Sequence, residues 1–276
     1  MKIPRTQRKS NCISTHNYSF KEIEKKIASV HWYHKFELVP NIITPGIVPF
    51  DAVKILDMIP IKDLAGKRII DIGAWDGPLS FELERRGASV IAVDIQDPEV
   101  TGFNIAKEIL HSEVEYIQGS VYDLSNLTHG SFDIVFFFGV YYHLKNPLLA
   151  FEEIRKLLNS QSRLFFEGEC LLHYVEDIEG KSQKDVDVES LGQSSLPISI
   201  FYPGRYKNTS NWVVPNLSCI RSWLHDAGLE LEIHYLDNDP AALPYPKQRI
   251  SGIAKIAGQP IIEEHPIIKM SSLDKD

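Results

Sequence analysis

The segment D-I-G-A-W-D-G, Asp71–Gly77, decides the fold. It follows the apolar run R-I-I-D-I, which is typical of a buried strand, and it precedes P-L-S-F-E-L-E-R-R-G. In that second stretch, Pro78 suits the first turn of a helix and Gly87 suits its C-terminal stop. Apolar strands and amphipathic helices keep alternating up to about residue 169, which predicts an α/β fold with a doubly wound parallel sheet. Ligands of such sheets bind beyond the carboxyl ends of the strands.

The rest of the chain divides around this pattern. Residues 170–215 are rich in Asp, Ser, Pro and aromatic residues and break the alternation, so we expect an inserted cap there. The apolar spacing also predicts a helix from Ser19 to Val30, an aromatic ordered loop after it, and a helix from Phe50 to Met58. The predicted parts are a disordered tail (1–17), an N-terminal helical and aromatic segment covering the site (18–65), a main domain (66–258) with the cap (170–215), and a C-terminal tail (259–276).

Composition limits the functional class. The 276 residues include 29 Lys+Arg and 37 Asp+Glu, for a formal net charge of -8, which disfavours binding to nucleic acid by charge alone without excluding it. The three cysteines form no C-x-x-C pair, and nothing completes the H-x-x-H of His31 and His34, so no metal site is predicted. The sequence shows neither a signal peptide nor a membrane span, which predicts a cytoplasmic protein.

The glycine segment carries the first functional signal. Its spacing is G-x-x-x-G, unlike the G-x-G-x-x-G of dinucleotide-binding proteins, and Asp71 and Asp76 would repel a pyrophosphate but suit a cation. Asp94 ends the next strand, where doubly wound folds place a carboxylate against ribose hydroxyls. A ligand with a ribose and a positive amino-acid end but no phosphate, such as S-adenosylmethionine, meets these requirements. A glycine pair after a strand is also a common plain turn.

From Gly66 to Gly168 the chain resembles the class I S-adenosylmethionine-dependent methyltransferases. The resemblance implies a Rossmann-like seven-stranded sheet and places the methionine moiety on the glycine segment and the ribose on Asp94. One departure is Trp75, where many members carry glycine, which makes the segment bulkier. The cofactor-binding residues that the resemblance implies are Asp71, Gly73, Ala74, Trp75, Gly77 and Asp94, then Ser120, Val121 and Tyr122 beside the adenine, and Phe138, Gly139 and Tyr142 beside the sulfonium.

Segments outside that half resemble one branch, the tRNA wobble-uridine carboxymethyltransferases and their relatives. They are W-Y-H-K-F-E-L, G-V-Y-Y-H followed by N-P, P-G-R-Y…N-W-V-V-P-N and Y-P-K-Q-R-I. In the tRNA enzymes, a lysine, a tyrosine and an arginine hold the extra carboxylate of a carboxylated donor. The tyrosine and arginine correspond to Tyr142 and Arg249, but the lysine position falls on His34, with Lys35 next. Because neutral histidine offers only a hydrogen bond, ordinary methyl transfer to a small molecule is favoured.

Methyl transfer is an in-line displacement that depends mainly on alignment, and a hydroxyl acceptor profits from a general base. His143 is the leading candidate for this base and His34 the second, although His143 could equally pack or cap a helix. The expected function is methyl transfer to the hydroxyl, amine or carboxylate of a small molecule. A tRNA carboxymethyltransferase and a catalytically silent donor-binding protein are the alternatives, and the oligomeric state stays open. The candidate acceptor-binding residues are Tyr202, Arg205, Tyr206, Trp212, Glu167 and Arg249.

Overall fold

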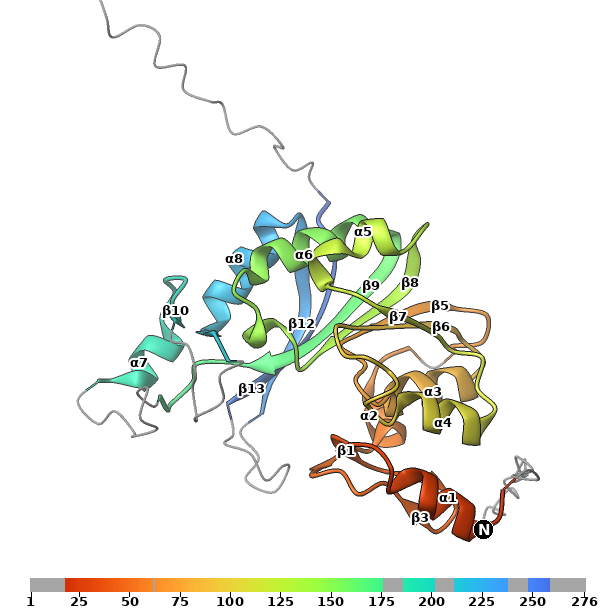
Figure 1. Cartoon of the computed structure of the whole chain (residues 1–276). Coiled ribbons are helices and arrows are strands. Elements are labelled where there is room, and N and C mark those ends of the chain that lie inside the picture. The colour runs from red at the N-terminus through yellow and green to blue at the C-terminus, as the bar shows by residue number, and fades with distance from the viewer. Residues whose placement is uncertain (1–17, 62, 176–185, 202–210, 238–247, 259–276) are drawn as a thin grey trace, which may run out of the picture. The chain divides into compact units, whose positions relative to one another are not determined.

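A computed structural model describes residues 18–61, 63–175, 186–201, 211–237 and 248–258 (Figure 1). The chain divides into two compact units, residues 1–120 and 121–276, and each is described by itself. The predicted α/β class is confirmed, with a seven-stranded mixed sheet. The predicted tails, residues 1–17 and 259–276, lie outside the described residues. The predicted domain boundaries stay a prediction.

The first unit contains three parallel strands in the order β5-β6-β7. Their inward residues are branched and aliphatic, and Ile69, Ile70 and Val93 are almost fully buried. Helix α3 joins β5 to β6 and packs on β6, and α4 joins β6 to β7. The elements are β5 (Arg68–Ile72), α3 (Pro78–Arg85), β6 (Ser89–Asp94), α4 (Phe103–Leu110) and β7 (Glu115–Gln118).

An N-terminal segment precedes these strands in the same unit. Both predicted helices are present, and Ser19 and Glu22 form a capping box at the start of the first. The predicted aromatic loop instead contains four short strands, with β1 parallel to β4 and β2 antiparallel to β3. Trp32 lies buried on the backbone of Gly102, and its indole N–H donates to the Ile27 carbonyl at 2.8 Å. The elements are α1 (Phe20–Ile27), β1 (His34–Lys35), β2 (Glu37–Val39), β3 (Ile42–Ile43), β4 (Val48–Pro49) and α2 (Ala52–Met58).

The second unit contains four strands in the order β12-β13-β9-β8. Strands β8 and β9 are parallel, as the doubly wound pattern predicts, but β13 runs antiparallel to both β9 and β12, so the parallel arrangement does not extend to β13. The connection from β12 to β13 is shorter than the crossover of a dozen or more residues that parallel neighbours need. Figure 1 shows α5, α6 and α8 on one side of these strands. The elements are α5 (Leu124–Leu127), β8 (Phe132–Phe138), α6 (Pro147–Lys156), β9 (Leu158–Glu169), α8 (Leu217–Asp226), β12 (Leu229–Asp237) and β13 (Arg249–Ile256), with a 3-10 helix at Val121–Asp123 and another at Tyr141–His143.

The predicted cap region interrupts the alternation between β9 and α8. Its described part contains α7 (Val188–Gln193), β10 (Ser199–Phe201) and β11 (Val213–Pro215), and β10 pairs antiparallel with β11. A small apolar cluster that includes Leu171, Val188 and Val214 packs these elements together. Within the part of the chain that the structure describes, no helix is long and apolar enough to cross a membrane.

Candidate functional site

The glycine turn between β5 and α3 has the backbone that its sequence predicts. Gly73 and Gly77 have φ values of 83° and 80°, in the left-handed region that favours glycine. Gly77 also has no room for a side chain, because an added Cβ would lie 2.6 Å from the Phe103 ring. Trp75 has a φ of 50° without being glycine, so this turn holds a strained residue.

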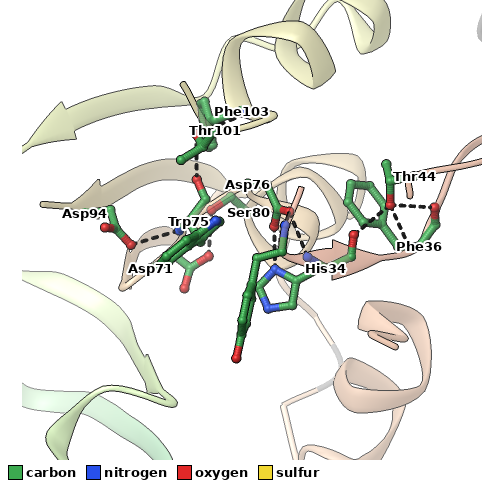
Figure 2. Close-up of polar contacts among 11 residues, drawn as sticks. His34, Phe36, Thr44, Asp71, Trp75, Asp76, Ser80, Asp94, Thr101 and Phe103 are labelled. Carbon is green, nitrogen blue, oxygen red and sulfur yellow. Dashed lines mark hydrogen bonds and ion pairs between the residues drawn. The ribbon is translucent and has the colours of Figure 1, made fainter. Parts of the chain in front are cut away.

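Asp94, at the end of β6, is joined to this turn. Its Oδ2 accepts a hydrogen bond from the Trp75 backbone N–H at 2.9 Å (Figure 2). Its Oδ1 accepts one from the Gln96 N–H at 2.9 Å. Burial raises the pKa of the Asp94 carboxyl above its ordinary value. A carboxylate has about four lone-pair sites, so the backbone N–H groups around Asp94 do not fill its acceptor capacity.

Asp71 lies beneath the turn and is fully buried among the first residues of α3. The Ser80 hydroxyl donates to its Oδ2 at 2.6 Å. Burial raises the pKa of the Asp71 carboxyl to about 6, although the Ser80 hydrogen bond opposes the shift. This hydrogen bond joins the end of β5 to the first turn of α3. Ala74 is also buried, and its N–H donates to the Val93 carbonyl at 3.3 Å.

Asp76 does not line the turn as an open carboxylate for a ligand cation, which corrects the expectation from the sequence. Its side chain is fully buried, and its Oδ2 accepts hydrogen bonds from the backbone N–H groups of Tyr33 and His34, both at 2.8 Å. Its Oδ1 bonds Nδ1 of the His34 ring (Figure 2). The aromatic segment supplies these donors because its polar backbone groups need partners once they are buried.

The surroundings of His34 fix its place on the turn. The Thr44 hydroxyl donates to the His34 carbonyl at 2.7 Å, and the Phe50 ring lies 4.8 Å from the imidazole. The neighbouring Tyr33 ring packs 5.0 Å from Trp75. Lys35, the next residue, has an exposed side chain. The N-terminal segment thus reaches the glycine turn through His34, the second-ranked base candidate.

In the second unit, an ion pair gathers three of the predicted residues. Arg249, at the start of β13, lies opposite Glu169 in the strand register, and its guanidinium reaches Glu167. Nε donates to Oε1 of Glu167, and Nη2 donates to Oε2 at 2.7 Å. Nη1 donates to the Tyr142 hydroxyl at 3.2 Å, and the guanidinium carbon lies 5.0 Å from the Tyr142 ring centroid. Burial raises the pKa of the Tyr142 phenol, although Arg249 opposes the shift.

The other predicted residues of this unit lie around Tyr142. The His143 ring packs 4.2 Å from the Tyr142 ring, and the Gly139 N–H donates to the Glu167 carbonyl at 2.9 Å. The Trp212 N–H donates to the Tyr142 carbonyl at 2.8 Å, and Lys145 Nζ lies 4.5 Å above the indole ring. The structure therefore brings Tyr142, His143, Glu167, Arg249 and Trp212 into one neighbourhood.

The remaining predicted residues have packing roles or are not described. Phe138 packs on Phe136 with their rings 5.3 Å apart, and the Tyr122 hydroxyl accepts the Asn146 N–H at 3.0 Å. Ser120 is the last residue of the first unit, and Val121 begins the second and is buried. Tyr202, Arg205 and Tyr206 lie outside the described residues.

Sequence reasoning missed the partnership of Tyr33 and His34 with Asp76. These residues are more than 40 positions apart, so no local spacing relates them. It also missed Ser80 as the partner of Asp71, because a serine one turn into a helix is unremarkable in sequence.

Comparison with known proteins gives the family of the middle of the chain. Residues 70–166 match a family described as "Methyltransferase domain". A tRNA U34 carboxymethyltransferase of Cellvibrio japonicus is 28% identical over 174 residues, covering 62% of this chain and 47% of that protein. A ubiquinone biosynthesis O-methyltransferase of Nitrosococcus oceani is 32% identical over 103 residues, covering 37% and 44%. The chain thus matches less than half the length of these relatives.

Solved structures share the fold at low identity. An S-adenosylmethionine-dependent methyltransferase from Mesorhizobium loti has a TM-score of 0.54 at 15% identity, covering 74% of this chain and 98% of that one. Another from Clostridium acetobutylicum has a TM-score of 0.51 at 12% identity, covering 75% and 91%. This likeness supports the Rossmann-like fold class.

Proposed function

Residues 70–166 form a methyltransferase domain of the class I S-adenosylmethionine-dependent kind, and on that premise we propose that this protein transfers a methyl group from S-adenosylmethionine to a small molecule. The acceptor carries a hydroxyl, an amine or a carboxylate. The observation that carries this proposal is the Asp94 carboxylate, fixed to the strained glycine turn through the Trp75 amide. That arrangement suits a ligand that carries a ribose next to a positively charged amino-acid end.

Several residues present here fit the donor. The turn from Gly73 to Gly77 would hold the methionine moiety, and Asp94 the ribose hydroxyls. Nε1 of Trp75 is buried and has no hydrogen-bond partner within the described residues, which leaves one indole N–H for a ligand oxygen. The family resemblance assigns the adenine to Ser120, Val121 and Tyr122. Phe138, Gly139 and Tyr142 would lie beside the sulfonium.

The bound donor supplies a methyl group on a positively charged sulfur. The chain's own residues then have two tasks, which are to align the acceptor with that carbon and to receive the acceptor's proton. A buried, aromatic-lined environment would also exclude water, which strengthens these interactions. Trp212, with Lys145 above its ring, is the described aromatic residue of the predicted cap that suits this task.

The ion pair of Arg249 with Glu167 favours the plain donor over the carboxylated one. Glu167 occupies two N–H groups on one edge of the guanidinium and neutralises its charge, so little attraction remains for a carboxylate on the donor. His34 is engaged with Asp76 and supplies no fixed positive charge in its neutral form. The net charge of -8 likewise disfavours tRNA as the acceptor.

Calorimetry with S-adenosylhomocysteine on the full chain tests donor binding. Asp94→Ala should weaken binding about 10- to 100-fold, because hydrogen bonds to a charged group contribute roughly 1.5–3 kcal/mol. Asp97→Ala is the matched control, since Asp97 lies three residues later with an exposed side chain. Absence of binding by the unaltered protein would overturn the proposal.

Two further measurements separate the alternatives. Mass spectrometry of the ligand that co-purifies with the protein distinguishes the plain donor from a carboxylated one, and the latter would favour the tRNA enzyme. Transfer of labelled methyl groups to a panel of small hydroxyl, amine and carboxylate compounds, compared with total tRNA, identifies the acceptor class. Donor binding without any transfer would favour the catalytically silent protein.

A further inference from the structure

The pair formed by His34 and Asp76 has the geometry of an oriented base. Asp76 has no exposed side-chain surface, and the exposed fraction of the His34 side chain is 15%. Backbone N–H groups can only donate, so Oδ2 of Asp76 must accept both the Tyr33 and the His34 amide hydrogen. Oδ1 is then the oxygen of this carboxylate that faces the His34 ring.

An ionised carboxylate can only accept, which settles the tautomer of the neutral imidazole. Nδ1 of His34 must carry the proton that it donates to Asp76 Oδ1, and Nε2 is then left with its lone pair. A carboxylate in this position holds a histidine ring in one tautomer and stabilises the imidazolium when a proton arrives.

The N-terminal segment prevents the ring from drifting away from this carboxylate. An added Cβ at Gly46 would lie 2.1 Å from the His34 carbonyl oxygen, so residues 44–46 sit directly on the His34 backbone. Phe50 bounds the ring with a centroid distance of 4.8 Å. The Tyr33 ring packs edge-on at 4.9 Å from the imidazole, and Asp71 is close enough for His34 to lower its pKa.

We propose that His34 is the general base of the reaction and that Asp76 is its positioning residue. This rests on the proposed function. A lone pair on the acceptor's hydroxyl oxygen attacks the methyl carbon, the carbon–sulfur bond breaks with its electron pair returning to sulfur, and the acceptor's proton passes to Nε2 of His34. S-adenosylhomocysteine and the methyl ether leave, and the imidazolium returns the proton to solvent.

This assignment reverses the order expected from the sequence, in which His143 ranked above His34. The reason is orientation, since a buried carboxylate on the predicted donor-binding turn holds His34. The base is then attached to the same few residues that would hold the methionine moiety.

The first test measures the tautomer and needs no acceptor. The full chain is labelled with ¹⁵N-histidine, and long-range proton–nitrogen spectra at neutral pH are compared with those of His34→Gln to identify the His34 signals. We expect the proton on Nδ1. In Asp76→Asn, the new amide can donate to Nδ1, and the proton should move to Nε2. Ser80→Ala is the matched control, because it alters the same turn without touching the pair, and it should keep the Nδ1 proton.

The second test uses a hydroxyl acceptor found in the labelled-methyl screen. His34→Gln and Asp76→Asn should each lower the turnover number at least 100-fold, in the range that general base catalysis contributes. Affinity for S-adenosylhomocysteine should change less than about threefold in His34→Gln. A proton on Nε2 in the unaltered protein, or full turnover by His34→Gln, would overturn the assignment. Failure to bind the donor at all would instead overturn the proposed function.

Discussion

Gly77, the last residue of the glycine turn, gives a sharp test of how that turn is packed. Its φ of 80° is unfavourable for any residue with a Cβ, and an added Cβ would lie 2.6 Å from the Phe103 ring and 2.8 Å from the Phe81 ring. Gly66 has a similar φ of 70°, but nothing lies within 4 Å of its added Cβ. The two glycines therefore share the backbone penalty and differ only in packing.

The expected magnitudes follow from these two terms. The left-handed backbone costs an alanine roughly 1–2 kcal/mol, and forcing a methyl group into a filled core costs typically about 1–3 kcal/mol more. Gly66→Ala should therefore lower the free energy of unfolding by about 1 kcal/mol, and Gly77→Ala by about 2–4 kcal/mol. The rings can relieve the contact only by moving together, because Phe81 and Phe103 pack 4.9 Å apart.

Urea unfolding followed by circular dichroism measures this difference. With an m-value near 3 kcal/mol/M, an extra loss of about 1–3 kcal/mol moves the midpoint of Gly77→Ala by roughly 0.3–1 M below that of Gly66→Ala. Equal midpoints for the two variants would refute the packing described around the turn. A lower m-value in one variant alone would show that its denatured or native state had changed instead.

Three further substitutions and one control, Asn146→Ala, test polar groups by the same unfolding assay. The pKa of Asp71 is about 6 in the folded protein, above its ordinary value, so the unfolded chain loses this proton first as the pH rises. The free energy of unfolding therefore falls between about pH 4 and pH 6. Asp71→Asn should be more stable at pH 7 by up to about 3 kcal/mol, and this difference should disappear near pH 4. Asn216, the buried N-cap of α8, donates to three backbone carbonyls and accepts two N–H groups, so Asn216→Ala should cost about 2–4 kcal/mol. Asn146→Ala, which removes the single cap bond of α6, should cost only about 1 kcal/mol. Glu167→Gln should cost about 1–3 kcal/mol, because it removes the charge opposite the mostly buried Arg249, and an unchanged midpoint would argue against this ion pair.

Much of the fold could be predicted because local patterns and local packing agree. The run from Arg68 to Ile72 is apolar and ends in glycine, and it forms β5 with the expected turn after it. The antiparallel course of β13 could not be predicted in this way. The direction of a strand in a sheet depends on the strand beside which it pairs, and the spacing of apolar residues is the same for parallel and antiparallel strands.

The sequence predicted individual residues of the candidate site but not which of them contact one another. Asp94 lies at the strand end, as its place after an apolar run predicted. The partners of Arg249 and His34 lie 82 and 42 residues away, and both are carboxylates that the sequence presents among 37 acidic residues. Only the packing of the aromatic segment on the turn selects Asp76 for His34.

The strained backbone at Trp75 lies between the contact to Asp94 and the contact to His34. A non-glycine residue in the left-handed region costs of order 1–3 kcal/mol and persists only where its surroundings fix it. Here the Trp75 N–H is bound by Asp94, and the following side chain, Asp76, binds the segment that carries His34. Because these contacts belong to two adjacent residues, the turn cannot relax without shifting both the predicted sugar contact and the proposed base. The strained conformation is therefore what keeps the carboxylate for the donor and the imidazole for the acceptor at a constant spacing.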